Sequence, residues 1–143
     1  IVLPTKTVPM GISAMLAFDP EAEADTNAVN MKNAAEKVAT GQITFAARDS
    51  DFDGFKIKEG DILAMENGKL SFTDRDFMRA AVKLTKSMCN KDTSFVTLIY
   101  GDNVSEAQAE SVRDVLETKL GGEVEVNVIN GGQPIYYFII SVE

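Results

Sequence analysis

The sequence contains no histidine among its 143 residues, and it contains a single cysteine. The missing histidine excludes the commonest general base and the commonest zinc ligand, so neither a Ser-His-Asp nor a Cys-His arrangement can form within this chain. The lone Cys89 excludes an internal disulfide framework and is typical of a reducing compartment. Because no neighbouring residue indicates a lowered pKa for Cys89, we expect an inert thiol there.

Two patterns that define large functional classes are also missing. No apolar run approaches the roughly 20 residues that a membrane-spanning helix needs. Neither GxxxxGK[ST] nor GxGxxG occurs, so no nucleotide-binding loop is visible. A starting methionine is absent as well, and the apolar residues 1–3 are typical of a strand already under way, so we expect a piece of a longer chain.

The composition indicates one compact domain over residues 1–143. The chain is 45% hydrophobic, which is enough for a sizeable core at this length. Lys and Arg number 14 against 22 Asp and Glu, for a net charge of -8. This balance argues against nucleic-acid binding through overall charge and is typical of a cytoplasmic protein.

The apolar periodicity and the turn signals predict an α/β fold, two-layered or a sandwich, with a mixed sheet. The expected order is β-α-α-β-β-β-α-β-α-β-β, with a hairpin in the middle and a second hairpin at the end. The expected elements are a strand at 1–3, a short helix around Ile12, Met15 and Leu16, a helix at 26–39 stopped by Gly41, strands at 42–48, 61–65 and 69–72, a helix of about 15 residues capped by Asp74, a strand at 95–100, a helix from Ser105 to Leu120, and strands at 123–129 and 135–142. Because the first helix is nearly all apolar, we expect it to be buried on most sides.

The stretch NGGQPIYYFIISVE, residues 130–143, joins a loop to the most strand-like run in the chain. Gly131-Gly132 can take positive φ without steric cost, and the run that follows predicts a buried central strand. One interpretation is a simple turn into a core strand. The alternative is a recognition rim that presents the polar atoms of Gln133 and the hydroxyl of Tyr136 or Tyr137.

Three residues before the first helix are a candidate anion site. The hydroxyls of Thr5 and Thr7, with Lys6 between them, could hold an anion at the N-terminus of that helix. The alternative is ordinary capping of the helix by a threonine.

A basic stripe is expected on the third helix. Arg75, Arg79, Lys83 and Lys86 are spaced so that they share one broad helical face. On a chain this acidic, the stripe could dock an acidic partner, or it could be a solvated outer face.

Arg48 follows the strand that ends at 48 and could hold a carboxylate or phosphate, or pair with Asp49, Asp51 or Asp53. The segment DSDFDG, residues 49–54, imitates the opening of a calcium-binding EF-hand loop. Position 12 of such a loop would be a glycine here, and strand patterns flank the segment, so we expect a solvated connection and no metal site.

Five segments carry a family resemblance. They are PTKTVPMGISAMLAFDP (4–20), ITFAARDS (43–50), IKEGD (57–61), TLIYGDN (97–103) and GGQPIYYFIISVE (131–143). Together they resemble the C-terminal region of the fatty acid kinase catalytic subunit, within the wider dihydroxyacetone kinase-like family. The resemblance covers nearly the whole chain, and TKTxPxGISA and GGQPxY are its most specific parts.

The resemblance implies a division of labour. An upstream kinase domain of the same chain would bind ATP and magnesium through aspartates, and that aspartate motif is absent here, so this fragment should need no cofactor and transfer no phosphate alone. The C-terminal part would be related in fold to the DegV-like fatty-acid-binding proteins. Such a binding protein presents its acyl carboxylate to the kinase, and the acyl phosphate feeds phospholipid synthesis. The histidine with which related dihydroxyacetone kinase subunits hold their sugar is absent.

Three hypotheses follow. The first is a non-catalytic docking module that contacts the fatty-acid-binding protein through the GGQP loop (131–134), the TKTVP connection (5–9) or the basic helix. The second is a domain that holds a fatty acid or a phosphorylated ligand directly, in an apolar pocket with Thr5, Thr7, Arg48 and Gln133. The third is a module that makes the kinase a homodimer.

Overall fold

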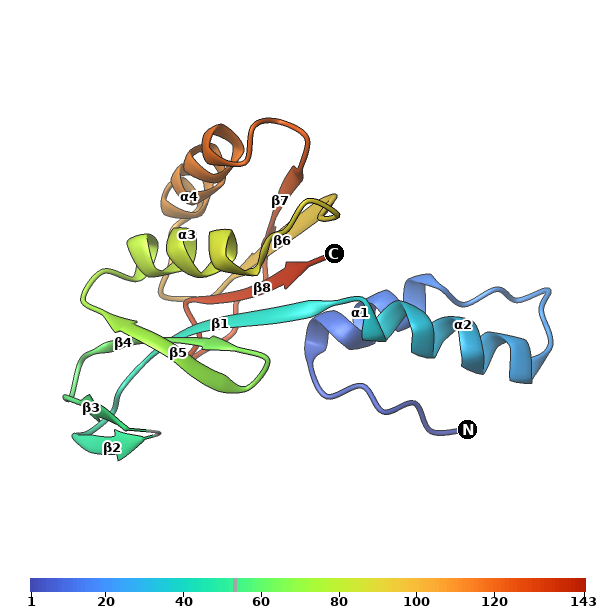
Figure 1. Ribbon diagram of the computed structural model, residues 1–143, viewed down its shortest axis with the longest axis horizontal. Helices are drawn as coiled ribbons and strands as arrows, with labels where there is room; N and C mark the ends of the chain where they lie inside the picture. Colours follow the sequence, from blue (N-terminus) through green and yellow to red (C-terminus); the bar gives the residue numbers. More distant parts are fainter. Residues whose placement is uncertain (53) are drawn as a thin grey trace.

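A six-stranded mixed sheet organises the fold in the computed structural model, which describes residues 1–52 and 54–143 (Figure 1). Its strands are β1 (Ala39–Phe45), β4 (Ile62–Glu66), β5 (Lys69–Asp74), β6 (Phe95–Tyr100), β7 (Glu125–Asn130) and β8 (Phe138–Val142). They lie in the order β5-β4-β1-β8-β6-β7; β6 and β7 pair in parallel, and the other neighbours pair antiparallel. The expected α/β class with a mixed sheet is confirmed.

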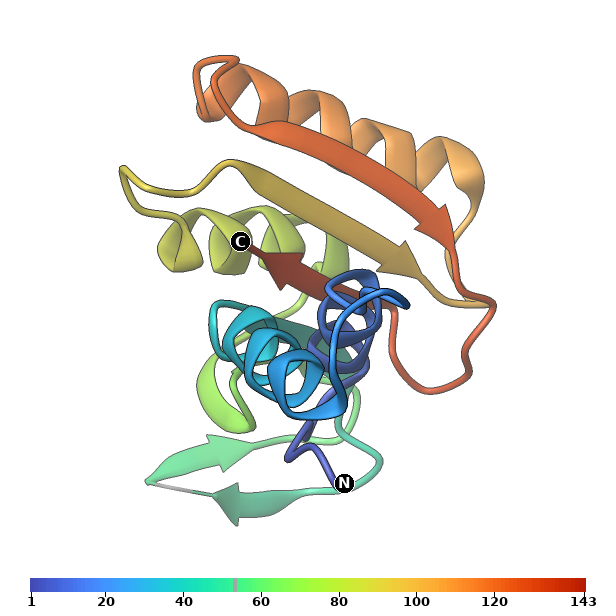
Figure 2. The ribbon, with the colours of Figure 1, turned by 90° about the vertical axis from the view of Figure 1, so that its right-hand side faces the viewer.

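Helices lie on both faces of this sheet (Figures 1 and 2). The helices are α1 (Val8–Leu16), α2 (Ala24–Glu36), α3 (Phe77–Met88) and α4 (Glu106–Lys119). Both α3 and α4 cover one face, whereas α1 lies over β8 on the other face and α2 packs on α1. The short strands β2 (Ser50–Phe52) and β3 (Phe55–Ile57) form a separate hairpin that the sequence did not predict. Among the described residues, no helix is long and apolar enough to cross a membrane.

The core lies between the sheet and the pair α3 and α4. Because side chains alternate along a strand, Phe138 and Ile140 of β8 point into this core, where both are fully buried. The stripe expected on the third helix, which includes Ala81, Leu84 and Met88, is buried against them. The last strand is central, between β1 and β6, as predicted.

Two local sequence signals have the predicted structure. Asn67 and Gly68 both have positive φ, 50° and 83°, and form the tight turn between β4 and β5. The side chain of Ser105 accepts a hydrogen bond from the backbone of Gln108 and the side chain of Gln108 accepts one in return, so the capping box of α4 is confirmed.

The strand expected at residues 1–3 is not formed. Ile1 and Val2 are exposed, and the backbone of this segment makes a local bond from the Thr5 N–H to the Leu3 carbonyl. A strand needs a hydrogen-bonded neighbour, and both edges of the sheet are taken by other segments of the chain.

The first helix is present but far less buried than expected. It packs through small residues, of which Ser13 and Ala14 are buried, while Leu16 is 82% exposed and Met15 is also exposed. The all-apolar composition therefore does not mean burial on most sides here.

Gly41 does not stop the second helix, which ends at Glu36. It lies instead within β1, where a Cβ atom would meet the Met88 sulfur at 2.9 Å and Leu84 Cδ2 at 3.0 Å. The residue is glycine because α3 passes close to the strand there.

The third helix begins later than predicted. Asp76, rather than Asp74, is its N-cap, and its carboxylate accepts from the N–H groups of Met78 (2.9 Å) and Arg79 (3.2 Å). Arg75 consequently lies before the helix and is not part of a helical stripe.

The hairpin expected at the end of the chain is absent. β7 and β8 do not pair, because β6 lies between them. The chain must therefore pass around the end of β6 to connect the two strands.

Candidate functional site

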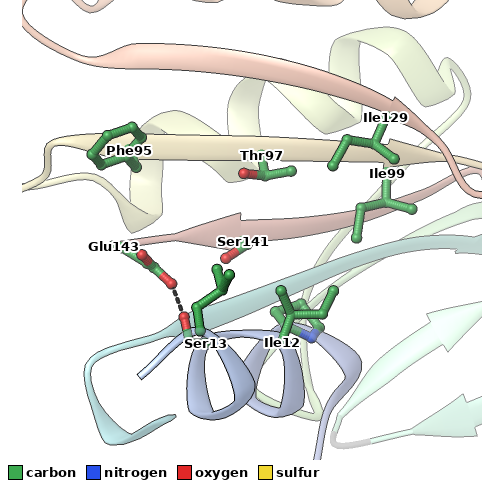
Figure 3. Close-up of a pocket in the computed structure, with 10 residues that line it drawn as sticks. Ile12, Ser13, Phe95, Thr97, Ile99, Ile129, Ser141 and Glu143 are labelled. Atoms are coloured by element: carbon green, nitrogen blue, oxygen red, sulfur yellow. Dashed lines mark hydrogen bonds between the residues drawn. The ribbon is translucent and has the colours of Figure 1, made fainter. Parts of the chain in front are cut away.

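An open groove of about 390 Å³ lies between α1 and the face of the sheet opposite the core (Figure 3). Its apolar lining comes from Pro9, Ile12 and Leu16 of α1 and from Phe95, Ile99 and Ile129 of the sheet. Its polar lining comes from Ser13, Thr97, Ser141 and Glu143. We call this feature the α1 groove.

Strand alternation explains why these side chains meet. On β6, Val96 and Leu98 point into the core, so the intervening Thr97 and its neighbours Phe95 and Ile99 point to the groove. Phe95 remains 46% exposed because α1 covers β8 but not the whole width of β6 and β7. The groove is thus the part of this sheet face that no helix fills.

The polar groups of the α1 groove are concentrated near β8. The Ser13 hydroxyl donates a hydrogen bond to Glu143 Oε1, which ties α1 to the residue after β8 (Figure 3). The Glu143 carboxylate lies at the same end of the groove as Phe95. Such a site suits an apolar group, and the carboxylate disfavours an anionic head group at that end.

The connection from β7 to β8 wraps the end of β6, and we call residues 131–137 the crossover loop. The N–H groups of Gly131 and Gly132 donate to the Tyr100 carbonyl at 2.9 and 3.2 Å. The side-chain amide of Gln133 donates to the Ile99 carbonyl at 3.0 Å, and the Gln133 carbonyl accepts from the Asp102 N–H at 3.0 Å. Gln133 therefore already uses its amide donor inside the chain, which is the structural role among the two interpretations of this loop.

Tyr136 belongs to the same loop and is half-buried, and its carbonyl also accepts from the Gln133 side chain, at 3.4 Å. Gly101 approaches the loop so closely that a Cβ atom there would lie 2.6 Å from the Gln133 carbonyl oxygen. The loop and the end of β6 are packed backbone to backbone.

Thr7 caps α1, so this alternative for the TKTVP connection is confirmed. Its hydroxyl accepts from the Met10 N–H at 3.3 Å and shares a 2.8 Å hydrogen bond with the Thr40 hydroxyl of β1. Thr5 and Lys6 instead line a separate cavity of about 300 Å³ beside α2, which also includes Lys32. The structure thus separates Thr7 from the two residues with which it was grouped.

The basic residues near α3 make contacts within the chain. Both the Nε and the Nη2 of Arg79 donate to the carboxylate of Asp74, so this pair is bidentate. The hydrogen bond from Arg79 lowers the pKa of Asp74 to about 2 and raises the pKa of Arg79. The ammonium of Lys83 lies 4.3 Å from the centre of the Phe72 ring. These cations are exposed, but their best partners are already internal.

Arg48 lies beyond β1, which ends at Phe45, and it is exposed. It forms no ion pair with the residues that the structure describes. Asp53, one of its three suggested partners and part of the EF-hand-like segment, lies outside the described residues. In residues 1–52 and 54–143, no group of three or more His, Cys, Asp or Glu residues could hold a metal.

Cys89 lies at the end of α3, away from the α1 groove. Burial raises the pKa of its thiol, which opposes thiolate formation. This supports the interpretation of an unreactive cysteine.

The sequence analysis missed the residues that form the α1 groove. Ile12, Phe95 and Ile129 were assigned only to a helix or a strand, whereas the structure brings them together. One signal was present: the alternation of EVEVNVI placed Ile129 on the wet face of its strand. An isoleucine on a wet face marks an exposed apolar site.

The fold and the groove define a mixed α/β domain with a packed core on one sheet face and an open apolar groove on the other. The chain belongs to the FakA-like C-terminal family, the C-terminal domain of fatty acid kinase proteins, which matches residues 1–143. The family expected from the five resembling segments is thereby confirmed.

Relatives match the chain along its full length. It is 42% identical over 142 residues to Protein YloV of Bacillus subtilis, which covers 99% of this chain and 26% of that protein. It is 35% identical over 143 residues to an uncharacterized protein of Staphylococcus haemolyticus and 32% identical to one of Staphylococcus aureus. The chain therefore spans about a quarter of the length of these curated relatives, 26% in each case.

Proposed function

We propose that this chain is the docking domain of a fatty acid kinase. It binds a fatty-acid-binding protein so that the upstream kinase domain of the same chain can phosphorylate the bound acyl carboxylate. Family membership supports the kinase context. The observation that carries the docking role is the α1 groove, an apolar surface on a sheet face that the domain's own helices leave open.

The charge pattern supports an apolar contact. The helix α1 has no charged residue between Val8 and Leu16, and its large side chains face outward. Exposed apolar surface of this kind is costly in water unless a partner covers it. A protein that carries a fatty acid is a partner of matching chemistry.

The described residues do not fit a kinase centre. They include no phosphate-binding loop and no acidic cluster that could hold magnesium, so ATP and magnesium would bind in the upstream domain. The chain alone should transfer no phosphate. Turnover of ATP by the purified domain would contradict this part of the proposal.

Calorimetric titration of the full-length protein with the fatty-acid-binding protein tests docking. Phe95→Ala and Ile12→Ala remove apolar area from the groove, and each should weaken binding about tenfold, as expected for an interface anchor. Val115→Ala is the matched control, since Val115 is a 42% exposed aliphatic residue on α4, which covers the other sheet face. Unchanged affinity in both groove variants would remove the α1 groove from the proposal.

A second candidate is direct binding of an acyl chain in the α1 groove. Its volume of about 390 Å³ is in the range of small-ligand sites. The Glu143 carboxylate argues against a fatty acid whose own carboxylate lies at that end. Mass spectrometry of lipids extracted from the purified protein distinguishes the two, because docking requires no bound lipid. A symmetric dimer seen by light scattering would favour self-association instead.

A further inference from the structure

Ile135 combines two unfavourable features. Its φ is 72°, in the left-handed region, and its side chain is 58% exposed. A β-branched residue is strained at this φ, where glycine or asparagine is the usual choice. An exposed isoleucine also gains little from burial. Neither the backbone nor the solvent explains why this position carries an isoleucine.

The crossover loop imposes this conformation through contacts on both sides of Ile135. The Thr44 hydroxyl donates to the Ile135 carbonyl at 2.9 Å, and the Tyr136 N–H donates to the Pro134 carbonyl at 2.8 Å. The Tyr137 N–H donates to the Ile43 carbonyl at 2.8 Å. Because these bonds use the backbone and Thr44, they hold residue 135 in place whatever its side chain.

Ile135 lies on the same face of the sheet as α1. Thr40 and Thr44 are four residues apart on β1, so their side chains share a face. Thr40 bonds Thr7 at the start of α1, and Thr44 bonds Ile135, about 13 Å further along the strand. The crossover loop also begins beside the α1 groove, since it follows β7 directly after Ile129 and Asn130.

The surface around Ile135 is uncharged. No charged residue occurs from Asn130 to Val142, as none occurs in α1. Such a surface offers nothing to phosphate groups or to an anionic membrane, which attract clustered cations. It fits an apolar pocket on a protein partner.

We propose that Ile135 is an anchor residue, held in a strained conformation by the crossover loop, that inserts into an apolar pocket of the fatty-acid-binding protein. This inference rests on the docking function proposed above and adds a specific contact to it. A rigid loop that presents one apolar side chain loses little conformational entropy on binding, which is typical of an interface hot spot.

The strain makes the test sharp, because stability and binding should change in opposite directions. Ile135→Asn places a residue that tolerates positive φ at this position. In the full-length protein we expect a melting temperature equal to or above that of the wild type, and affinity for the fatty-acid-binding protein reduced about tenfold or more. Ile135→Val keeps the strain and most of the apolar surface, so affinity should fall only a few fold.

Val115→Asn is the matched control. It makes the same change of an exposed β-branched aliphatic residue to asparagine on the opposite side of the sheet, and we expect unchanged affinity. Affinity of the Ile135→Asn variant within twofold of a wild type that binds would overturn the role of Ile135 but leave docking intact. A lower melting temperature for this variant would also overturn it, because Ile135 would then support the fold. Absence of binding by the wild type would overturn docking itself, and with it this inference.

Discussion

The two faces of the central sheet differ in what their side chains do. On the face under α3 and α4, residues such as Leu98, Phe138 and Ile140 are fully buried and wholly apolar. On the face toward α1, the strands present hydroxyls, including Thr97 and Ser141, and α1 covers only part of the width. The fold thus concentrates its stability on one face.

This difference separates folding from binding. The buried face supplies the hydrophobic free energy, which grows with the apolar area removed from water. The α1 face is held to the sheet by local hydrogen bonds, such as Thr7 to Thr40, and keeps its large apolar side chains exposed. Substitutions on the two faces should therefore have different consequences.

The largest expected effect is on the buried face. Phe138→Ala removes a fully buried ring from the centre of the sheet and should lower the free energy of unfolding by about 3–5 kcal/mol. Ile12→Ala, on the α1 groove, should cost less than about 1 kcal/mol because Ile12 is already 39% exposed. Urea denaturation of both variants measures the difference. Equal losses would mean that the α1 face also carries the core.

An intermediate effect is expected where β6 meets the crossover loop. Gly101→Ala places a methyl group against the Gln133 and Tyr136 carbonyl oxygens and should destabilise the protein by about 1–3 kcal/mol. Gly11→Ala is the contrasting variant, since Gly11 lies in α1 with no atom within 4 Å of an added Cβ. It should stabilise α1 by about 0.5–1 kcal/mol. If thermal unfolding shows both variants to be neutral, the close packing at Gly101 is wrong.

The smallest effect is expected at the pair of Asp74 and Arg79. Asp74 has a pKa lowered from 3.8 to about 2, so its contribution is present above about pH 4 and is lost as the pH falls toward 2. Asp74→Asn should cost up to about 1 kcal/mol at pH 7, because Arg79 is largely exposed and the pair is screened by water.

The pH dependence distinguishes this pair from surface charge in general. The stability difference between wild type and Asp74→Asn, measured by urea denaturation, should shrink below pH 4. Asp114→Asn is the control, since Asp114 pairs with Arg113 at 3.4 Å on the exposed side of α4. A difference for Asp74→Asn that stays constant down to pH 2 would contradict the lowered pKa.

Local features were predictable because neighbours in sequence produce them. The turn at Asn67-Gly68 and the capping box of Ser105 and Gln108 depend on residues within a few positions of each other. The inner stripe of α3 follows from helical periodicity. The candidate site was less accessible, because residues from α1, β6 and β7 meet there only after folding.

Three errors have a common cause. The absent strand at residues 1–3, the exposed side of α1 and the missing terminal hairpin all depend on which segment lies beside which. Apolar composition shows that a segment can be buried, but not whether another segment covers it. The role of Gly41 belongs here too, since only the approach of α3 explains it.

Periodicity, turn chemistry and motifs along the chain were enough to establish the α/β class, the central last strand and the family. Three further features required the folded structure: β6 separates β7 from β8, the α1 groove stays open, and Ile135 is held at positive φ. Exposure and strain could not be predicted because they arise from contacts between distant segments, and those contacts exist only in the folded chain.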